Sequence, residues 1–230
     1  MQNIPIFTFD GPSASGKGTI SKLLAKNLKY NFLDSGAIYR VLGLAALKKD
    51  TDLQNEKALA KLAVGLDLVF SFTTDLETKI SLDGKDVSYE VRTPECGNIA
   101  SKISVFTEVR KALLERQRAF LKSPGLIADG RDMGTVVFPE AGLKFFLDAK
   151  PEIRAKRRLS QLKKMGIDVS MERILLETLE RDKRDSSRSF SPLEPAKDAI
   201  LLDTGEMSIE QVIKEVTLRV ETYLLKSIAK

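Results

Sequence analysis

A glycine-rich run near the N-terminus has the residue types and spacing of a phosphate-binding loop. It consists of a glycine, four residues and then Gly-Lys, and its members are Gly11, Pro12, Ser13, Ala14, Ser15, Gly16, Lys17, Gly18 and Thr19. The run follows an apolar stretch and precedes a helical pattern, so its backbone N–H groups can surround an anion at a helix N-terminus. Lys17 can then reach the β- and γ-phosphates of a nucleotide. We therefore expect this run to bind nucleotide phosphates.

Two residues could help to bind a metal ion. Gly18 stands where many such loops carry Ser or Thr, and the hydroxyl comes one residue later, at Thr19. The usual direct hydroxyl ligand to Mg²⁺ is therefore displaced, and Thr19 is expected to contribute to phosphate or metal binding. Asp129 closes an apolar stretch, where a carboxylate can hold Mg²⁺ through water. The alternative for Asp129 is a helix N-cap or an ordinary loop carboxylate.

The composition excludes several kinds of chemistry. Histidine is absent from the 230 residues, and the single cysteine, Cys96, reads as a small buried apolar residue. Ser-His and Cys-His nucleophilic systems, most zinc catalysis and intramolecular disulfides are therefore excluded. The chemistry must use carboxylates, lysine, arginine, hydroxyls, backbone amides or a hard metal ion. A formal net charge of +5 favours anionic partners, which could be nucleotides, nucleic acid or a membrane surface.

Short apolar stretches alternate with longer helical patterns along most of the chain. Strands are expected at 4–9, 31–34, 126–129, 143–148 and 199–203. Helices are expected directly after the glycine-rich run and at 38–48, 105–121, 151–165, 171–188 and 208–227. This alternation predicts βαβ units and therefore an α/β protein with a parallel sheet covered on both faces.

One segment departs from this alternation. Residues 67–72 and 78–82 alternate in polarity or are β-branched, and Asp83-Gly84-Lys85 is a hairpin signal. We expect a small β-containing subdomain grafted at a loop, spanning about 63–102.

Two helical segments carry charges at helical spacing. In the 171–188 pattern an apolar face continues into Arg181, Asp185 and Arg188, which would line a cleft; the alternative is a solvated face with ion pairs. The 151–165 pattern places three arginines on one face, namely Arg154, Arg157 and Arg158. Guanidinium groups placed in this way could neutralise the charge of a phosphate group. The alternative is a basic solvated or RNA-contacting helix.

The glycine-rich run by itself leaves several classes open: switch GTPases, ATPases, motor or transporter subunits, and small-molecule kinases. The chain has no Asn-Lys-x-Asp run, which guanine-specific switches need. The Gly-Lys-Gly-Thr variant, the length and the inserted hairpin favour kinases of small phosphate-bearing substrates. A nucleic-acid-binding protein is the more distant alternative. It lacks an aromatic stacking platform, because tryptophan is absent and only four tyrosines occur.

Two further runs resemble the hallmark segments of bacterial cytidylate kinases. They are Leu33-Asp34-Ser35-Gly36-Ala37-Ile38-Tyr39-Arg40 and Ala128-Asp129-Gly130-Arg131-Asp132-Met133-Gly134-Thr135. With the glycine-rich run, the Glu180-Arg181-Asp182…Asp185…Arg188 segment and Ser208-Ile209-Glu210-Gln211-Val212, the resemblance covers essentially the whole chain. It implies a single P-loop kinase domain over 1–230, with a five-stranded parallel sheet flanked by helices and an insertion that binds the nucleoside monophosphate. It also implies a short lid at about 154–168, whose arginines would close over the transferring phosphoryl group and stabilise its charge.

The resemblance also implies an activity and a site. The γ-phosphoryl group of ATP would be transferred to CMP or dCMP, with run 11–19 as the ATP site and a catalytic set of Lys17, Arg131 and Asp129. The CMP phosphate would be gripped by Arg40, Arg131 and Arg188. Arg181 and Asp185 would bond the sugar hydroxyls. The base would be read by Ser101, Arg110 and Asp132, and Ser35 would also contact the substrate.

The acceptor oxygen of such a reaction is largely ionised at neutral pH, because the second pKa of a phosphate is roughly 6. No general base is then required, which agrees with the absence of histidine. Mg²⁺ is expected as the cofactor, bound by Thr19 and by Asp129 through water. The expected partners are ATP and CMP or dCMP, without nucleic acid or membrane. The nearer alternative is a P-loop kinase with another acceptor, such as UMP or AMP.

The remaining expectations concern location and assembly. The N-terminal apolar stretch ends by Asp10, which is too short for a signal peptide or a membrane span. We therefore expect a cytoplasmic protein, and a monomer.

Overall fold

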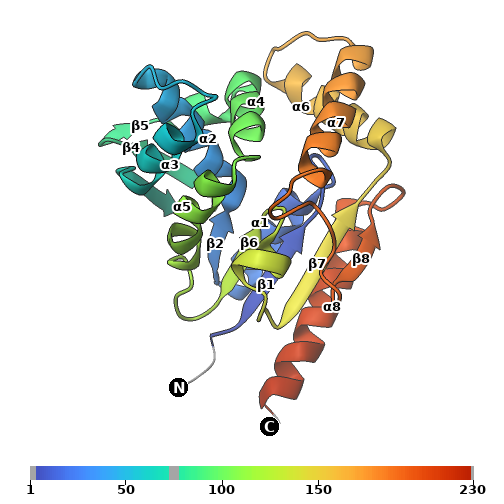
Figure 1. Cartoon of the computed structure of the whole chain (residues 1–230). Helices are drawn as coiled ribbons and strands as arrows, with labels where there is room; N and C mark the ends of the chain where they lie inside the picture. The colour runs from blue at the N-terminus through green and yellow to red at the C-terminus, as the bar shows by residue number, and fades with distance from the viewer. Residues whose placement is uncertain (1–3, 73–77, 229–230) are drawn as a thin grey trace. The chain divides into compact units, whose positions relative to one another are not determined.

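The computed structural model describes residues 4–72 and 78–228 (Figure 1). The chain divides into two compact units. One unit comprises Met1–Phe32 with Leu121–Lys230, and the other comprises Leu33–Phe120. The predicted insertion at 63–102 falls within the second unit, which extends further in both directions.

A five-stranded sheet organises the first unit, and of the sheet's residues only Leu33 and Asp34 belong to the second unit. Its strands are β1 (Ile6–Asp10), β2 (Asn31–Asp34), β6 (Leu126–Asp129), β7 (Leu143–Asp148) and β8 (Ile200–Asp203), in the order β2-β6-β1-β7-β8. β1 pairs in parallel with β6 and β7, and β7 pairs in parallel with β8. Every residue of β1 and β6 is buried, as expected for parallel strands covered on both faces. The predicted parallel α/β fold is therefore confirmed.

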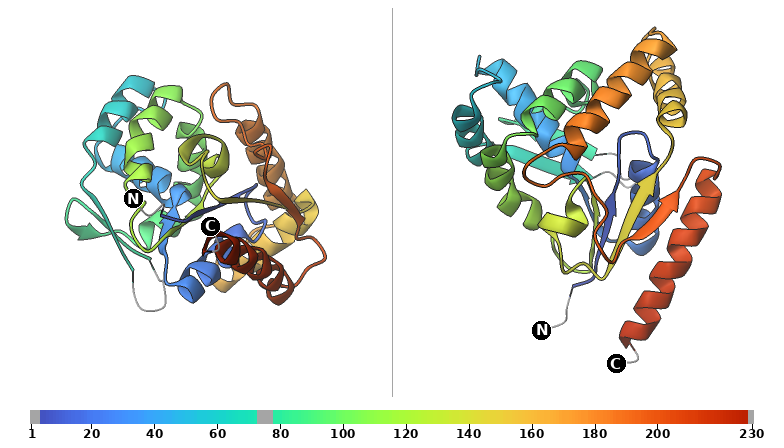
Figure 2. Two further views of the ribbon diagram at one scale, coloured as in Figure 1. Left: turned by 90° about the horizontal axis from the view of Figure 1, so that it is seen from below. Right: turned by 45° about the vertical axis from the view of Figure 1, so that its right-hand side comes forward.

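Within the described residues, four helices and one π-turn complete this unit. They are α1 (Lys17–Leu28), η2 (Met133–Val137), α6 (Pro151–Lys164), α7 (Met171–Ser186) and α8 (Ile209–Ile228). Helices α1 and α8 lie side by side on one face of the sheet (Figure 2). The ring of Tyr223 on α8 meets Phe7 of β1 edge-on at 5.6 Å, and Phe9 stacks on Phe145 of β7 at 5.0 Å. Because these phenylalanines are buried, the core fixes the strand ends from which the functional loops leave.

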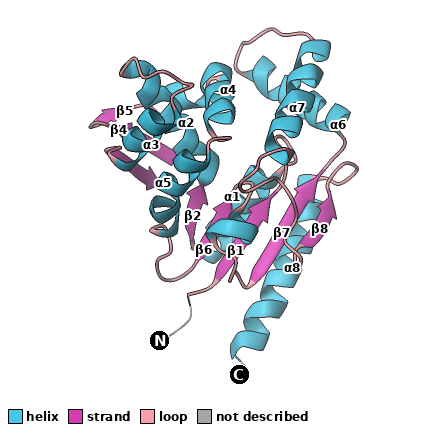
Figure 3. Cartoon of the chain, viewed as in Figure 1, coloured by secondary structure: helices cyan, strands magenta, loops and turns pink. Residues whose placement is uncertain are grey.

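Helices α6 and α7 pack against each other through a small apolar cluster formed by Ala155, Leu162 and Ile174. Pro151 occupies the first turn of α6, and the side chain of Ser170 caps α7 by accepting the backbone N–H of Arg173. Both helices are drawn in cyan in Figure 3. Gly166 follows the end of α6 with a φ of 74°, a left-handed conformation that glycine adopts readily after a helix, so α6 ends close to the expected position 165.

The second unit is a helical layer with a small sheet. Its elements are α2 (Ser35–Lys48), α3 (Glu56–Val64), β3 (Leu68–Phe72), β4 (Thr78–Leu82), β5 (Lys85–Asp86), η1 (Glu90–Arg92), α4 (Pro94–Ile103) and α5 (Thr107–Arg118). Strands β3, β4 and β5 pair antiparallel in that order. Asp83 and Gly84 both have positive φ at the turn between β4 and β5, as a tight hairpin requires. The predicted hairpin is confirmed for the described residues; 73–77 lie outside them.

Some boundaries differ from the sequence-based expectations. The expected helix 105–121 begins later, at Thr107, because Phe106 has an extended backbone (ψ 125°). The expected helix 171–188 ends at Ser186, whose hydroxyl bonds back to the carbonyl of Asp182 and competes with helix continuation. The expected strand 4–9 is found at Ile6–Asp10. Helices α3 and α4 are additional to the expected elements. Among the described residues, no helix is long and apolar enough to cross a membrane.

Candidate active site

The glycine-rich run forms the turn between β1 and α1. Gly11 has a φ of 142°, and a Cβ there would lie 2.0 Å from the carbonyl oxygen of Leu147, so only glycine fits. Gly16 has a φ of 94° and caps the N-terminus of α1, which begins at Lys17. The run thus has the strand-turn-helix geometry in which backbone N–H groups and the helix dipole attract an anion.

Lys17 lies inside this turn. Its side chain is buried, and its Nζ donates a hydrogen bond to the carbonyl oxygen of Pro12 at 3.0 Å. Burial, followed by the nearby positive charge of Arg131, lowers the pKa of Lys17 to about 7. A bound polyphosphate would favour the charged amine, because an opposite charge in a poorly solvated site raises a lysine pKa. The site is therefore suited to a lysine whose positive charge is balanced by the phosphates of the bound nucleotide.

Side chains from other segments of the chain form hydrogen bonds with backbone carbonyl groups of the glycine-rich run. The hydroxyl of Thr204, which follows β8, lies 2.8 Å from the carbonyl oxygen of Ser15 and 3.0 Å from that of Asp148. Arg154 reaches the carbonyl oxygen of Ser13 at 3.4 Å. These bonds occupy carbonyl groups and leave amide groups for a ligand. The hydroxyl of Ser15 is buried and has no hydrogen-bond partner in the described part of the chain, which fits a residue that awaits one.

The three predicted lid arginines differ in their surroundings. Arg154 is buried, and it donates to the carbonyl oxygen of Ala149 at 2.7 Å and to Asp182. Arg157 donates to the hydroxyl of Thr204 at 3.0 Å and to its carbonyl oxygen. Arg158 donates to Gln161 at 3.4 Å on the exposed side of α6. Arg154 and Arg157 are therefore engaged with the segments around the glycine-rich run.

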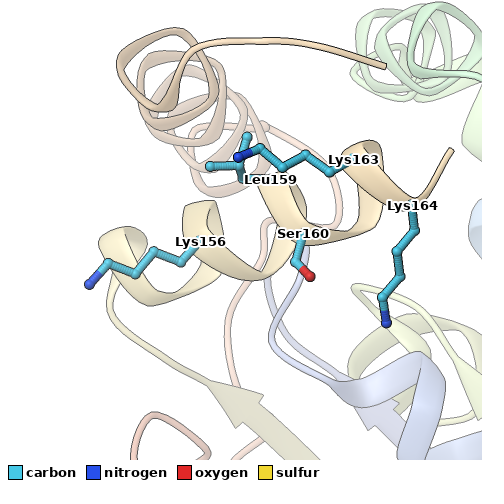
Figure 4. A pocket seen from close by; sticks show the side chains of 5 residues that line it. All are labelled: Lys156, Leu159, Ser160, Lys163 and Lys164. Carbon is cyan, nitrogen blue, oxygen red and sulfur yellow. The ribbon is translucent and has the colours of Figure 1, made fainter. Parts of the chain in front are cut away.

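A surface hollow on α6 is separate from these residues. It is lined by Lys156, Leu159, Ser160, Lys163 and Lys164. Figure 4 shows the Lys163 side chain extending toward Leu159, whereas the side chains of Lys156 and Lys164 leave the helix in other directions. None of the predicted site residues lines the hollow, so we do not assign it to the active site.

The loop after β6 is fixed by β1. The N–H of Gly130 donates to the carbonyl oxygen of Phe9 at 2.9 Å. The carboxylate of Asp10 accepts the N–H groups of Met133 and Gly134, both at 2.8 Å. Burial, only partly offset by these two bonds, raises the pKa of Asp10 to about 7. The loop that carries Asp129, Arg131 and Asp132 is thus anchored at both ends.

Arg131 and Arg188 share one carboxylate. Nε of Arg131 donates to Asp185 at 2.9 Å, and Arg188 donates to the other oxygen of Asp185. Burial opposes ionisation of Asp185, but the charges of Arg131, Arg188 and Arg181 outweigh it and hold the pKa of Asp185 below its usual value. The predicted phosphate ligands Arg131 and Arg188 and the predicted sugar ligands Arg181 and Asp185 therefore form one cluster.

Asp129 has the surroundings of a carboxylate that helps to bind a metal ion with a phosphate. It ends β6 and is buried. A Cβ on Gly18 would lie 3.1 Å from its Oδ2, so the carboxylate faces the glycine-rich run. Thr19 follows directly and is exposed. Among the described residues, no group of three or more His, Cys, Asp or Glu side chains could hold a metal ion.

The unit Leu33–Phe120 holds the other predicted acceptor residues. The hydroxyl of Ser35 donates to Oε1 of Gln117 at 2.6 Å, and both side chains are buried. The guanidinium of Arg110 lies over the ring of Tyr39 at 5.4 Å and donates to the carbonyl oxygen of Ser104 at 3.1 Å. These helices place buried polar groups in an otherwise apolar interior, as expected for a site that recognises a polar ligand.

Ser101 and Arg40 complete this set. Ser101 is buried on α4, and its hydroxyl has no hydrogen-bond partner within the described residues. Arg40 is half-buried on α2 and donates to the carbonyl oxygen of Val91 at 3.1 Å. A Cβ on Gly97 would lie 3.6 Å from the Arg40 guanidinium, which α4 therefore flanks. Cys96 is buried and contacts the carbonyl oxygen of Arg40, as its reading as a small buried residue predicts.

Several residues that shape the site were not predicted as site residues from the sequence, namely Asp10, Gln117 and Thr204, together with Tyr39 and Asp182, which stand only within the runs that carry the family resemblance. The sequence could have predicted a role for Asp10, because this residue ends an apolar strand in the same way as Asp129 does. Gln117 and Thr204 had none, since a single amide or hydroxyl in a helix or loop is common.

The chain is similar to proteins of known family. A family model described as cytidylate kinase matches residues 7–222. A cytidylate kinase of Aeromonas hydrophila is 55% identical over 223 residues, which cover 97% of this chain and 96% of the relative. Cytidylate kinases of Klebsiella pneumoniae and Salmonella choleraesuis are 55% and 56% identical, over 93% and 92% of this chain and the same shares of the relatives.

Proposed function

The chain belongs to the cytidylate kinase family, and from this premise we propose which residues carry out each part of its reaction. The chain is a phosphotransferase that moves the γ-phosphoryl group of ATP to CMP or dCMP. Family membership favours these acceptors over UMP and AMP.

The donor is bound by the glycine-rich run 11–19. Backbone N–H groups and the N-terminus of α1 hold the phosphates, and Lys17 moves from the carbonyl oxygen of Pro12 to the β- and γ-phosphates. The hydroxyl of Ser15, buried without a partner within the described residues, gains one from the donor phosphates. Arg154 and Arg157 keep this turn in shape through carbonyl groups, and lid arginines neutralise charge on the phosphoryl group as it transfers.

Mg²⁺ would be held by Asp129 through water and by Thr19, and it would neutralise charge on the donor phosphates. The support is that the Asp129 carboxylate faces Gly18, next to Lys17 and Thr19. The chain's own contribution is to fix this carboxylate at the buried end of β6, so that it does not reorganise during the reaction.

The acceptor phosphate is bound by Arg131, Arg188 and Arg40. The observation that carries this proposal is the shared carboxylate of Asp185, which holds the guanidinium groups of Arg131 and Arg188 together before substrate arrives. A phosphate with about two negative charges can then accept bonds from a pre-formed pair of arginines. Arg181 and Asp185 bond the sugar hydroxyls, using the lone pairs of Asp185 that the arginines leave open.

The base is recognised by Ser101, Arg110 and Asp132, with Ser35 as a further contact. The cytosine amino group donates to Asp132, while a hydroxyl and a guanidinium serve the ring acceptors. Uracil presents a carbonyl where cytosine has its amino group, so a buried carboxylate would face an acceptor. That mismatch costs on the order of 2 kcal/mol, enough for a clear preference.

One experiment tests the acceptor and its ligands together. ADP release is measured with CMP, dCMP, UMP and AMP for the wild type and for Arg188→Ala. We expect CMP and dCMP to be the preferred acceptors. Arg188→Ala should raise the KM for CMP by about 100-fold, because a charged hydrogen-bond partner of the phosphate is lost. Arg173→Ala changes an exposed arginine of the same helix and should behave as wild type. A preference for AMP or UMP, or an unchanged KM in Arg188→Ala, would contradict the proposal.

A further inference from the structure

Asp10 is a buried acid that the proposed reaction does not use. It ends β1 immediately before Gly11, and only 5% of its surface is exposed. Both of its carboxylate oxygens accept a backbone N–H, one from Met133 and one from Gly134, each at 2.8 Å. Within 4–72 and 78–228, no lysine or arginine forms an ion pair with Asp10. Burying such a carboxylate is costly, so its presence here implies that its hydrogen bonds matter.

The two amide groups that Asp10 binds begin the π-turn η2. The first N–H groups of any helical turn lack acceptors within the turn, and leaving them buried without a partner is unfavourable. π-turns are rare and occur frequently at functional sites. Asp132, directly before η2, has a φ of −143° and a ψ of 24°, so the direction of its side chain depends on where the turn begins.

Arg131 and Asp132 lie between two anchors that both come from the end of β1. On one side, the N–H of Gly130 bonds to the carbonyl oxygen of Phe9 at 2.9 Å. On the other side, Asp10 holds Met133 and Gly134. The first anchor is an ordinary backbone bond, whereas the second depends on the two acceptor oxygens of the Asp10 side chain.

We propose that Asp10 is a positioning residue for substrate recognition, which holds the loop of Arg131 and Asp132 in the geometry that binds and selects CMP. The proposal rests on the function proposed above for Arg131 and Asp132. Asp10 also precedes the first glycine of the ATP-binding run, so a single strand end positions both the donor turn and the acceptor-reading loop.

The test compares Asp10→Ala, Asp10→Asn and Thr8→Val with the wild type. Asp10→Asn keeps the volume and one acceptor oxygen. Thr8→Val is the matched control: Thr8 is buried on the same strand, and its hydroxyl has no hydrogen-bond partner among the described residues. The measurements are kcat and KM with CMP, UMP and ATP, together with the melting temperature.

Asp10→Ala should raise the KM for CMP about tenfold and lower the CMP-to-UMP ratio of kcat/KM by a similar factor, since two buried amides lose their acceptor. Asp10→Asn should give smaller changes in the same direction. The KM for ATP should change by less than about threefold in either variant. Thr8→Val should leave all of these values unchanged.

A purely structural role of Asp10 would lower the melting temperature and the active fraction, but leave the KM for CMP and the CMP-to-UMP ratio at wild-type values. That result, or failure of Asp10→Asn to fold, would overturn the proposal. Asp132→Ala, measured in parallel, separates the two levels of the argument. If Asp132→Ala keeps full discrimination against UMP, the proposed function of Asp132 fails; if it loses discrimination while the Asp10 variants keep theirs, only the role of Asp10 fails.

Discussion

The guanidinium of Arg154 donates hydrogen bonds to both carboxylate oxygens of Asp182, which joins α6 to α7. Arg154 is 3% exposed and Asp182 is 25% exposed, so the pair is mostly desolvated. The same guanidinium group reaches the carbonyl oxygen of Ser13 in the glycine-rich run. The ion pair therefore supports the two helices and the donor turn at once.

Asp182→Asn should destabilise the protein by about 2 kcal/mol. The reason is that Arg154 stays buried and charged, whereas residue 182 no longer carries the opposite charge. The KM for ATP should rise more than the KM for CMP, since the contact that is loosened supports the donor turn. Urea unfolding and steady-state kinetics measure the two effects. Glu177→Gln breaks an exposed pair with Arg173 on the same helix and should cost less than about 1 kcal/mol. Equal free energies of unfolding for the two variants would show that the Arg154–Asp182 pair stabilises the protein no more than an exposed ion pair does.

Lys17→Met should reduce kcat by at least about a thousandfold, because Lys17 is the group expected to neutralise charge on the transferring phosphoryl group. Binding of CMP should change little, since Lys17 is assigned to the donor. ADP release and calorimetric titration with CMP measure the two properties. Lys26→Met changes an exposed lysine of the same helix and serves as the control. Loss of CMP binding by a folded Lys17→Met protein would contradict the division between donor and acceptor residues.

The sequence predicted the sheet well, because parallel strands that are covered on both faces read as short apolar runs. Leu126–Asp129 and Leu143–Asp148 are found with the expected bounds. Helix ends were predicted less well, since they depend on local competition such as the bond from the Ser186 hydroxyl to the Asp182 carbonyl oxygen. The short helix α3 was not predicted.

The glycine-rich run could be identified because its chemistry is contiguous in the chain. The bonds that hold it in shape could not, because they join distant residues: Thr204 is 189 positions from Ser15, and Asp10 is 123 positions from Met133. Helical spacing predicted that Arg154 and Arg157 belong together. It did not reveal that both bind segments around the donor turn, because spacing within a helix carries no information on what another segment places opposite.

The lowered pKa of Lys17 predicts a pH-dependent difference in stability between the wild type and Lys17→Met. The folded protein releases the Lys17 proton near pH 7, whereas the unfolded chain keeps it up to about 10.5. Between these values the unfolded state binds more protons, so the contribution of Lys17 to the free energy of unfolding rises with pH. Below pH 7, Lys17 is protonated in both the folded and the unfolded protein. The full cost of burying its charge then lowers the free energy of unfolding.

Lys17→Met lacks this cost and should be more stable than the wild type at pH 6 to 7. Its advantage should shrink by about 1.4 kcal/mol per pH unit in the middle of the window between pH 7 and 10.5. Urea unfolding without nucleotide, at several pH values from 6 to 9.5, measures the difference. An advantage that stays constant or grows with pH would show that the pKa of Lys17 is not lowered in the folded protein.

Ser35 and Gln117 should act as one unit in nucleotide binding. Because the Ser35 hydroxyl donates to Gln117 at 2.6 Å, its oxygen keeps its lone pairs for a donor on the nucleotide. Gln117→Leu removes the acceptor and lets the hydroxyl rotate, so the KM for CMP should rise about fivefold, corresponding to about 1 kcal/mol. Ser35→Ala should have a similar effect. If the two residues act together, the double variant should be little worse than either single variant. Kinetics with CMP on all four proteins measure the coupling, and fully additive effects would mean that Gln117 does not orient Ser35.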